Sequence, residues 1–396
     1  MQTTHPWDAR LERVIRYSLY VFAAAMPFAI ALTQIAVAIA VLAWLTRIVY
    51  TRGARWPRLG IEWAFAAFIA AEVLSCIFST NLGQSLVYLK RLLLLPIVYV
   101  VAAGVEDEKT LKHLGLIFIA SIALYAVWGI SSFFANPEVR VRHIQNSMTA
   151  GGITMIGATV TLALALRLSE RRYRLLFAVA TVVILGCLLL TATRGSWLGF
   201  FVAALFLIGA AHRKLLLIVP VVAAAFYLLQ PEQFAPRIRH FFDPTWGTNA
   251  KRLHWWSIGW EIYKDHPVVG IGDVGTTPMY VRYAPPGETE LVGHFHSNYV
   301  HIAVTLGSVG LAAFLFMIGA VFVRIAQQLR RCRGVPAWSA AWTLAALAVF
   351  LAFNINGFFE WNFGDQEIIT MVWFCTGLGL RQGVPAGQVC EHEASL

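Results

Sequence analysis

The chain has 396 residues, of which 58% are hydrophobic and only 13% charged, and its mean hydropathy is +0.65. A soluble domain cannot bury so much apolar surface, so these values exclude a soluble protein and indicate that lipid surrounds most of the chain. The net charge of +10 would suggest nucleic acid in a soluble protein. In a membrane protein basic residues flank the spans and set their orientation, so we expect no nucleic-acid partner.

Apolar runs long enough to cross a bilayer follow one another along the chain. A hydrocarbon core of about 30 Å needs about 20 apolar residues per helix. Residues 1–16 are polar and lack a signal-peptide pattern, so the first span is expected to act as the insertion signal. We predict an all-α polytopic membrane protein of about 12 spans, with a turn at Thr33 and Gln34 between the first two. The predicted spans are 17–33, 34–50, 61–79, 91–104, 112–134, 148–166, 174–191, 196–211, 214–229, 298–323, 338–355 and 366–381.

The charges of the short loops orient these spans. If the N-terminus is cytoplasmic, most of the 31 lysines and arginines lie in cytoplasmic segments, as the positive-inside rule requires. The sequence therefore predicts that both termini are cytoplasmic and that the long polar stretch 230–297, between spans nine and ten, lies outside. We treat 1–396 as a single membrane domain with 230–297 as an inserted outer loop subdomain.

The outer loop is rich in proline and tryptophan. Within it, residues 251–264 predict a short amphipathic helix. Indole rings favour the lipid headgroup layer, so we expect the loop tryptophans to face that layer. They are Trp246, Trp255, Trp256 and Trp260.

Several basic residues lie outside, against the topology rule. Arg194 stands in Thr193-Arg194-Gly195-Ser196-Trp197, between two apolar runs with almost no loop. An arginine at membrane depth is costly and is a functional candidate by default, the alternative being a snorkelling loop arginine. The planar guanidinium binds phosphate oxygens bidentately, so this cluster favours an anionic, phosphate-bearing lipid. The other outer candidates are Lys90, Arg91, Arg140, Arg142 and Arg252.

Three histidines, His294, His296 and His301, close the polar loop and open the tenth span. Histidine is the side chain most easily tuned to act as a base near neutral pH. The alternatives to a catalytic base are a structural role and a metal site. The cysteine and carboxylate partners that a metal would need nearby are sparse, so we expect no metal and no cofactor. Glu360 and Asp365 are interpreted as solvated loop charges, the alternative being that they orient an arginine or a histidine.

The segment Gly270-Ile271-Gly272 is a weak motif by itself. It follows no strand and belongs to no βαβ unit, so it does not imply a nucleotide-binding fold. We interpret its glycines as a tight turn that returns the loop to the membrane.

Taken together, these segments resemble the O-antigen ligase family, which includes O-antigen polymerases and protein O-oligosaccharyltransferases. The matching segments are 193–198, Arg252 with Trp256 ahead of 266–272, and 294–300 continuing through 305–311. Their order and locations also match, over roughly the second half of the chain, whereas the first half resembles the family only in its spans. The family usually has asparagine directly after the histidine, but here Ser297 separates His296 from Asn298.

The resemblance implies a GT-C-like glycosyltransferase of the bacterial inner membrane. Its donor would be O-antigen on undecaprenyl diphosphate and its acceptor a hydroxyl of the lipid A–core outer sugar, joined at the periplasmic face with inversion and without a metal. His296 is implied as the base, with His294 as the alternative, and Arg194 and Arg252 as the residues that hold the diphosphate. The expected substrate-binding residues are His294, Asn298, Lys90, Arg91, Arg140 and Arg142.

Other functions remain open at this point. An O-antigen polymerase, which extends lipid-linked glycan, or a transferase to protein serine would use the same motifs. An envelope lipid or glycan transporter, from a different class, would need ionisable residues spread through the bundle and repeats between its halves. The predicted spans are nearly free of charge, so the sequence favours the transferase.

Overall fold

The structure is a computed structural model that describes residues 7–135, 140–141, 145–220, 224, 228, 235–331 and 337–381. The described residues form helices and no strand, so the predicted all-α fold class is confirmed. Arg142, one of the predicted site residues, lies outside them. The helices are α1 (Asp8–Ala25), α2 (Ile30–Thr46), η1 (Arg47–Thr51), α3 (Glu62–Ile77), α4 (Leu82–Tyr88), η2 (Leu89–Leu94), α5 (Pro96–Gly104), α6 (Glu108–Ala135), α7 (Ser147–Arg167), α8 (Arg171–Leu190), α9 (Arg194–His212), η3 (Arg213–Ile218), α11 (Ala235–Arg239), α12 (Gly247–Asp265), α13 (Thr277–Tyr283), α14 (Asn298–Arg331), α15 (Ala337–Asn356) and α16 (Gln366–Leu380).

Eight helical segments among the described residues are long and apolar enough to cross a membrane. They make the chain a multi-pass membrane protein, but they do not establish the predicted count of twelve. Helices α3 and α16 have only 16 and 15 residues, and much of the predicted span 214–229 lies outside the described residues. The eight segments are Ile30–Thr51, Leu82–Gly104, Glu108–Ala135, Ser147–Arg167, Arg171–Leu190, Arg194–Ile218, Asn298–Arg331 and Trp338–Asn356.

The first two helices meet earlier than the sequence predicts. The turn between α1 and α2 is formed by residues 26–29, which contain Pro27, and not by Thr33 and Gln34. Proline has no N–H to continue the helix, whereas Thr33 lies inside α2 and its hydroxyl donates to the Ala29 carbonyl at 2.8 Å. The prediction was wrong because α1 already begins at Asp8, among charged residues that were assigned to the polar N-terminal segment.

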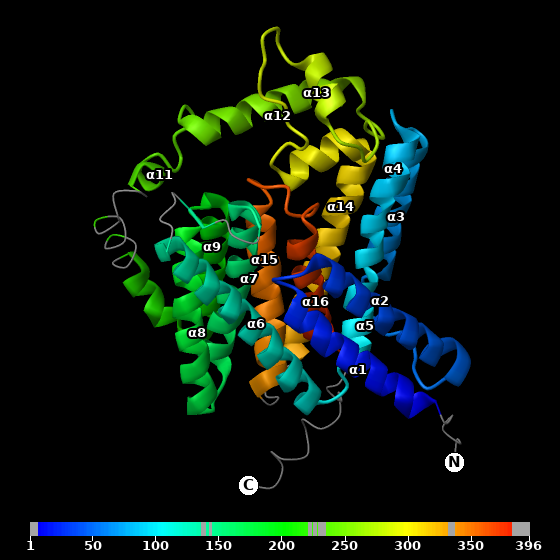
Figure 1. Cartoon of the computed structure of the whole chain (residues 1–396), viewed down its shortest axis with the longest axis vertical. Coiled ribbons are helices and arrows are strands. Elements are labelled where there is room, and N and C mark those ends of the chain that lie inside the picture. Colours follow the sequence, from blue (N-terminus) through cyan, green and yellow to red (C-terminus); the bar gives the residue numbers. More distant parts are fainter. Residues whose placement is uncertain are drawn as a thin grey trace.

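Helices α7 and α15 lie at the centre of the bundle, with the other spans around them (Figure 1). Small residues let their backbones approach closely, as in many membrane helix pairs. A Cβ atom at Gly199 of α9, for example, would lie 2.7 Å from the Ala352 carbonyl oxygen of α15. The hydroxyl of Thr193, directly before α9, donates to Ser147 O at the start of α7 at 2.9 Å, so the starts of α7 and α9 lie side by side at one end of the bundle.

A cap formed by α11, α12 and α13 covers that end of the bundle (Figure 1). The predicted helix 251–264 is confirmed as the middle of the longer helix α12. The cap has a hydrophobic core of its own, which also includes residues that lead into α14. Its buried members are Ile258, Ile262, Ile271, Val274, Tyr280, Val292, Phe295 and Val304.

The cap is joined to the membrane helices by backbone pairing at a break in α14. Gly307 has φ 65° and ψ −166°, which interrupts the helix and frees carbonyls of the preceding turn. The cap satisfies them, since the Ile271 amide donates to Val304 O at 3.1 Å and the Gly272 amide donates to Thr305 O at 2.9 Å. Unwound backbone at this depth needs such internal partners.

Glycines are required on both sides of this pairing. A Cβ at Gly270 would lie 2.3 Å from Thr305 O, and a Cβ at Gly307 would lie 2.3 Å from Val268 O. The chain turns at residues 267–269, directly before Gly270, and not at Gly270 and Gly272, where the sequence placed the tight turn. The sequence did not show that these glycines let two distant backbones meet.

We expect Gly307→Ala to destabilise the protein strongly. The strained backbone alone costs roughly 1–3 kcal/mol for a residue with a side chain, and the contact with Val268 O adds to it. Gly319→Ala is the matched control, because it lies on the same helix with no atom within 4 Å of the added methyl group. Thermal unfolding of the detergent-solubilised variants measures the difference. Equal melting temperatures for both variants would contradict the role given to the break.

Candidate functional site

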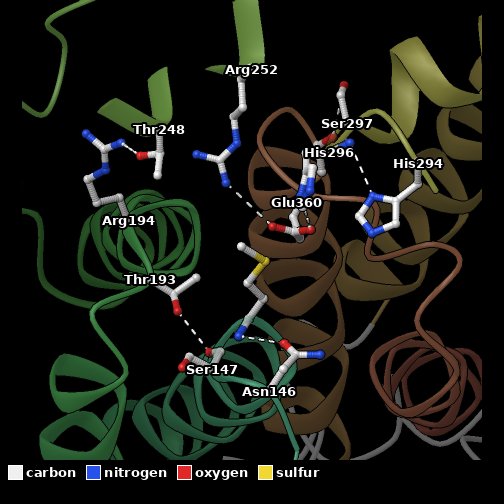
Figure 2. A network of polar contacts seen from close by, with 12 residues as sticks. Asn146, Ser147, Thr193, Arg194, Thr248, Arg252, His294, His296, Ser297 and Glu360 are labelled. Atoms are coloured by element: carbon white, nitrogen blue, oxygen red, sulfur yellow. Dashed lines mark hydrogen bonds and ion pairs between the residues drawn. The ribbon is translucent and has the colours of Figure 1, made fainter. Parts of the chain in front are cut away.

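The buried carboxylate of Glu360, in the loop between α15 and α16, lies at the centre of the site (Figure 2). Its Oε1 is 2.9 Å from Nδ1 of His296, and its Oε2 is 3.5 Å from Nη2 of Arg252. The residue is only 7% exposed. The interpretation of Glu360 as a solvated loop charge is therefore wrong, and the alternative, that it orients an arginine or a histidine, describes its contacts.

A sequence signal for this position did exist. Glu360 stands in Phe358-Phe359-Glu360-Trp361-Asn362-Phe363, and an acidic residue between aromatic neighbours is unlike a solvated loop. Burying a carboxylate is costly unless it is paired, so such a residue predicts a cationic partner. The sequence could not say which one.

Asn298 fixes the Glu360 loop against the first turn of α14. Its side chain accepts from the Phe363 amide at 3.0 Å and donates to Oδ1 of Asn362 at 2.5 Å. Its own amide donates to Gly357 O at 2.7 Å. Asn298 is completely buried, so the structure places this predicted substrate-binding residue behind the site, where it positions Glu360.

His296 is held in an unusual backbone conformation. Its φ is +46°, in the left-handed region that non-glycine residues seldom occupy and that is often found at functional sites. The indole ring of Trp255 stacks on its imidazole, with the ring centroids 4.9 Å apart. Glu360 is hydrogen-bonded to Nδ1 of His296, and none of the described residues forms a hydrogen bond with Nε2.

The ionisation of Glu360 fixes the tautomer of His296. Burial has the largest influence on the pKa of Glu360 and would raise it. The hydrogen bond from His296 and the charges of His296 and Arg252 outweigh burial and hold this pKa below its ordinary value. An ionised carboxylate only accepts, so Nδ1 of His296 must donate and Nε2 is left with a lone pair when the ring is neutral.

His294 lies beside His296, with the ring centroids 4.3 Å apart. Burial, with the charge of His296, lowers the pKa of His294 to about 4, so it is neutral near pH 7. Its Nδ1 accepts the His296 amide at 3.3 Å, which leaves the proton of the neutral ring on Nε2. The geometry therefore leaves a hydrogen-bond donor on His294 and a lone pair on Nε2 of the neutral His296 ring.

These groups also have the composition of a small metal site. His294, His296 and Glu360 each offer an atom within 4.8 Å of the others, so the carboxylate partner that the sequence lacked is present. The guanidinium of Arg252 shares the same carboxylate and places a positive charge beside these atoms. That positive charge disfavours a divalent cation bound to His294, His296 and Glu360, and it disfavours a singly charged proton on the same groups less.

Arg194, at the first turn of α9, forms hydrogen bonds with the segment that leads into α12 and with the first turn of that helix. Its guanidinium donates to His240 O at 3.1 Å and to the side-chain oxygens of Thr248 and Asn249, both at 2.6 Å. It also lies 4.8 Å from the ring of Trp246. The structure thus shows Arg194 as one attachment of the cap to the membrane helices.

Arg252, the partner of Glu360, is one of three arginines that lie near one another, together with Arg194 and Arg237. Arg237 and Arg252 lie close enough to Arg194 for their charges to act on it. Burial lowers the pKa of Arg237, and it lowers that of Arg252 although Glu360 opposes the shift. Among the described residues, Glu360 is the carboxylate that pairs with this group. A buried excess of positive charge is typical of an anion site.

A cavity of about 430 Å³ opens on the other side of Glu360. Of the predicted site residues, His294 and Arg140 line it, and Nε of Arg140 donates to Thr191 O at 3.2 Å. Its wall is formed by Arg140, Asn146, Ser147, Met148, Thr149, His294, Glu360, Trp361, Gly364 and Asp365. Asp365 accepts from the Thr149 hydroxyl at 2.5 Å, so its interpretation as a solvated charge is also wrong.

Besides Asn298, two more of the predicted substrate-binding residues that the structure describes do not line this cavity. Lys90 is exposed on η2. Arg91 forms an ion pair with Asp273 of the cap at 3.1 Å and lies 5.3 Å from the ring of Trp361. Arg91 therefore contacts Trp361, the residue after Glu360, and pairs with the cap.

The loop tryptophans contact protein more than the sequence suggested. Trp255 and Trp256 are partly buried, and the indole N–H of Trp256 donates to Phe295 O at 2.8 Å. Trp246 covers Arg194, and Trp260 is 57% exposed. Two of the four loop tryptophans, Trp255 and Trp256, therefore pack against the histidine segment, with Trp255 stacked on His296.

Comparison with known proteins supports the resemblance drawn from the motifs. Residues 179–315 match the family described as O-antigen ligase. The matched segment contains Arg194, Arg252, His294 and His296, and it ends before Glu360. No curated protein matches the chain.

The neutral state of His294 gives a pH dependence. Because its pKa is about 4 in the folded protein and 6.5 ordinarily, the unfolded chain binds the proton first as the pH falls. Folding stability therefore decreases between pH 6.5 and pH 4 by roughly 3 kcal/mol from this group. We expect the free energy of unfolding to fall between pH 7 and pH 4 by roughly 3 kcal/mol more in wild type than in His294→Gln. His212→Gln, at the exposed end of α9, is the control, and identical pH profiles for wild type and His294→Gln would contradict the assignment.

Proposed function

We propose that this chain, a member of the O-antigen ligase family over residues 179–315, is a glycosyltransferase that uses a lipid-linked diphosphate donor. The donor is O-antigen on undecaprenyl diphosphate, and the acceptor is a hydroxyl of the outer sugar of lipid A–core. The observation that supports it most is the carboxylate of Glu360, which contacts both His296 and Arg252. It joins a proton acceptor and an anion-binding group at one point.

His296 acts as the general base in this proposal. Its Nε2 takes the proton of the acceptor hydroxyl while that oxygen attacks the anomeric carbon of the donor. Glu360, hydrogen-bonded to Nδ1 at 2.9 Å, orients the ring and stabilises the imidazolium that forms. The bond between the anomeric carbon and the phosphate oxygen breaks, its electron pair leaves with the diphosphate, and one displacement inverts the anomeric centre.

The arginines stabilise the leaving group. Negative charge grows on the diphosphate as the bond breaks, and fixed positive groups placed beforehand lower the energy of that state. Arg252 is the guanidinium nearest the base, and Arg194 and Arg237 add charge behind it. Arg194 also holds the start of α12, the helix that carries Arg252. We propose that this charge serves where other transferases use a metal.

The side of the membrane follows from the loop charges. Basic residues in the short loops favour a cytoplasmic position for both termini, which puts the cap and the site on the periplasmic face of the inner membrane. Lipid-linked diphosphate donors are already activated, so transfer on that face needs no nucleotide.

A reconstituted assay tests the proposal. Purified protein in detergent receives the donor and lipid A–core, with a chelator present, and the expected result is a ladder of glycosylated lipid A–core. Longer lipid-linked glycan from the donor alone would assign the chain as a polymerase. Activity that is lost with chelator and restored by a divalent ion would place a metal on His294, His296 and Glu360.

In this assay we expect His296→Gln to lower kcat by about 10²- to 10⁴-fold, the range for loss of a general base. His254→Gln is the control, because His254 lies on the same cap and bonds Glu288 at 2.6 Å, apart from the site. Equal kcat for wild type and His296→Gln would remove His296 from the mechanism.

Arg252→Gln should act on the donor. Loss of one charged contact to phosphate weakens the interaction by roughly 1.5–3 kcal/mol, about ten- to a hundredfold in kcat/KM for the donor. The matched control is Arg239→Gln, an exposed arginine of the same cap. If the two variants gave the same donor kinetics, Arg252 would not bind the diphosphate.

A further inference from the structure

The cavity beside Glu360 has two walls from distant parts of the chain. One is the start of α7 with the residues before it, and the other is the loop that runs from Glu360 to Asp365. Its volume of about 430 Å³ lies within the range of small-ligand clefts. His294 and Glu360, which both contact His296, form one end of it, so a ligand bound here lies next to the two neighbours of that base.

The charges of this cavity do not suit a diphosphate. Its lining contains one arginine and two carboxylates, those of Glu360 and Asp365. The guanidinium of Arg140 donates to Thr191 O and to the hydroxyl of Thr193. A polyanion would meet the two carboxylates directly. The arginine cluster of Arg194, Arg237 and Arg252, by contrast, is not among the lining residues.

Figure 2 shows the separation of the two regions around Glu360. Arg252 approaches Glu360 from the cap, whereas Asn146 and Ser147 lie on the far side of it, at the start of α7. Arg252, the arginine that pairs with Glu360, and the cavity therefore meet this carboxylate from different sides.

The start of α7 presents uncharged polar groups. Oδ1 of Asn146 caps the helix by accepting from the amides of Met148 and Thr149 at 2.9 and 3.0 Å. The side chain is exposed, and its NH₂ group is the part left to donate to a ligand. Amide and hydroxyl groups of this kind are suited to sugar hydroxyls.

Asp365 and Trp361 complete the opposite wall. Burial, with the charge of Glu367, raises the pKa of Asp365 to about 7, so the carboxyl is partly protonated near neutral pH. Gly364 makes room for the indole, since a Cβ there would lie 2.0 Å from Nε1 of Trp361. An aromatic ring beside a few oriented polar groups is the usual lining of a small-molecule cleft.

We propose that this cavity is the acceptor subsite, which binds a neutral pyranose through Asn146, Thr149 and Asp365 and directs its hydroxyl toward His296. The inference rests on the proposed function, which supplies the donor and the reaction. Donor diphosphate binds on the arginine side of Glu360, and the acceptor sugar binds on the α7 side. In a single displacement the acceptor oxygen attacks the anomeric carbon on the face opposite the leaving diphosphate, so separate subsites for the two substrates fit this geometry.

The decisive variant is Asn146→Asp. Aspartate is as good an N-cap as asparagine, so α7 keeps its cap, while the NH₂ donor is replaced by a negative oxygen. Asn81→Asp is the matched control, because Asn81 caps α4 in the same way, accepts from the Gln84 amide, and is absent from the cavity wall. Thr149→Val is a second variant, which removes the hydroxyl that bonds Asp365.

Steady-state kinetics with each substrate varied in turn is the first readout. We expect both cavity variants to raise the KM for lipid A–core about three- to tenfold, the effect of one lost neutral hydrogen bond, with the KM for the lipid-linked donor unchanged. Asn81→Asp should behave as wild type. A raised donor KM, or an unchanged acceptor KM in both variants, would overturn the subsite.

Binding of delipidated core oligosaccharide to the full chain, without donor, is the second readout. It carries the sugars and no lipid anchor, and it needs no turnover. Weaker binding in Asn146→Asp than in Asn81→Asp supports the subsite even if wild type forms no product, in which case the transfer reaction fails and the sugar site stands. Equal binding by the two variants would overturn the subsite even in a protein that transfers glycan.

Discussion

The buried carboxylate of Glu360 is the interaction on which the other parts of the site depend. A charge with 7% exposure is tolerated only when it is paired, and its partners come from two other segments, His296 before α14 and Arg252 on α12. The cap must therefore sit where Arg252 reaches the loop between α15 and α16. Asn298 fixes the position of that loop against the first turn of α14, so His296 and Glu360 keep their relative geometry.

The contacts that hold the cap in that position include two near the site. Arg194 fixes the start of α12 through Thr248 and Asn249, and the backbone of residues 267–272 pairs with the break in α14 at Gly307. Both are short-range contacts to membrane helices, which are themselves packed tightly. A functional constellation needs such rigid support, because a small displacement of a base or an anion-binding group costs much of its effect.

The sequence predicted the features that are encoded locally. Long apolar runs predicted the helical membrane fold, the pattern of 251–264 predicted the loop helix, and the family resemblance implied that His294, His296 and Arg252 belong to one site. It misplaced the first turn because charged residues near Asp8 hid the start of α1. It missed the role of Glu360 because that residue is 64 positions from His296, and nothing in a single sequence records their contact. The cavity was invisible for the same reason, since its walls join α7 to the loop before α16.

A double-mutant cycle tests the central claim, that Glu360 acts through His296. The measurement is kcat for glycan transfer in wild type, Glu360→Gln, His296→Gln and the double variant. If the carboxylate serves the base, the double variant is no slower than His296→Gln alone, because residues that act as a unit are not additive. Additive losses in the double variant would contradict the account, since the two side chains would then contribute independently to the reaction.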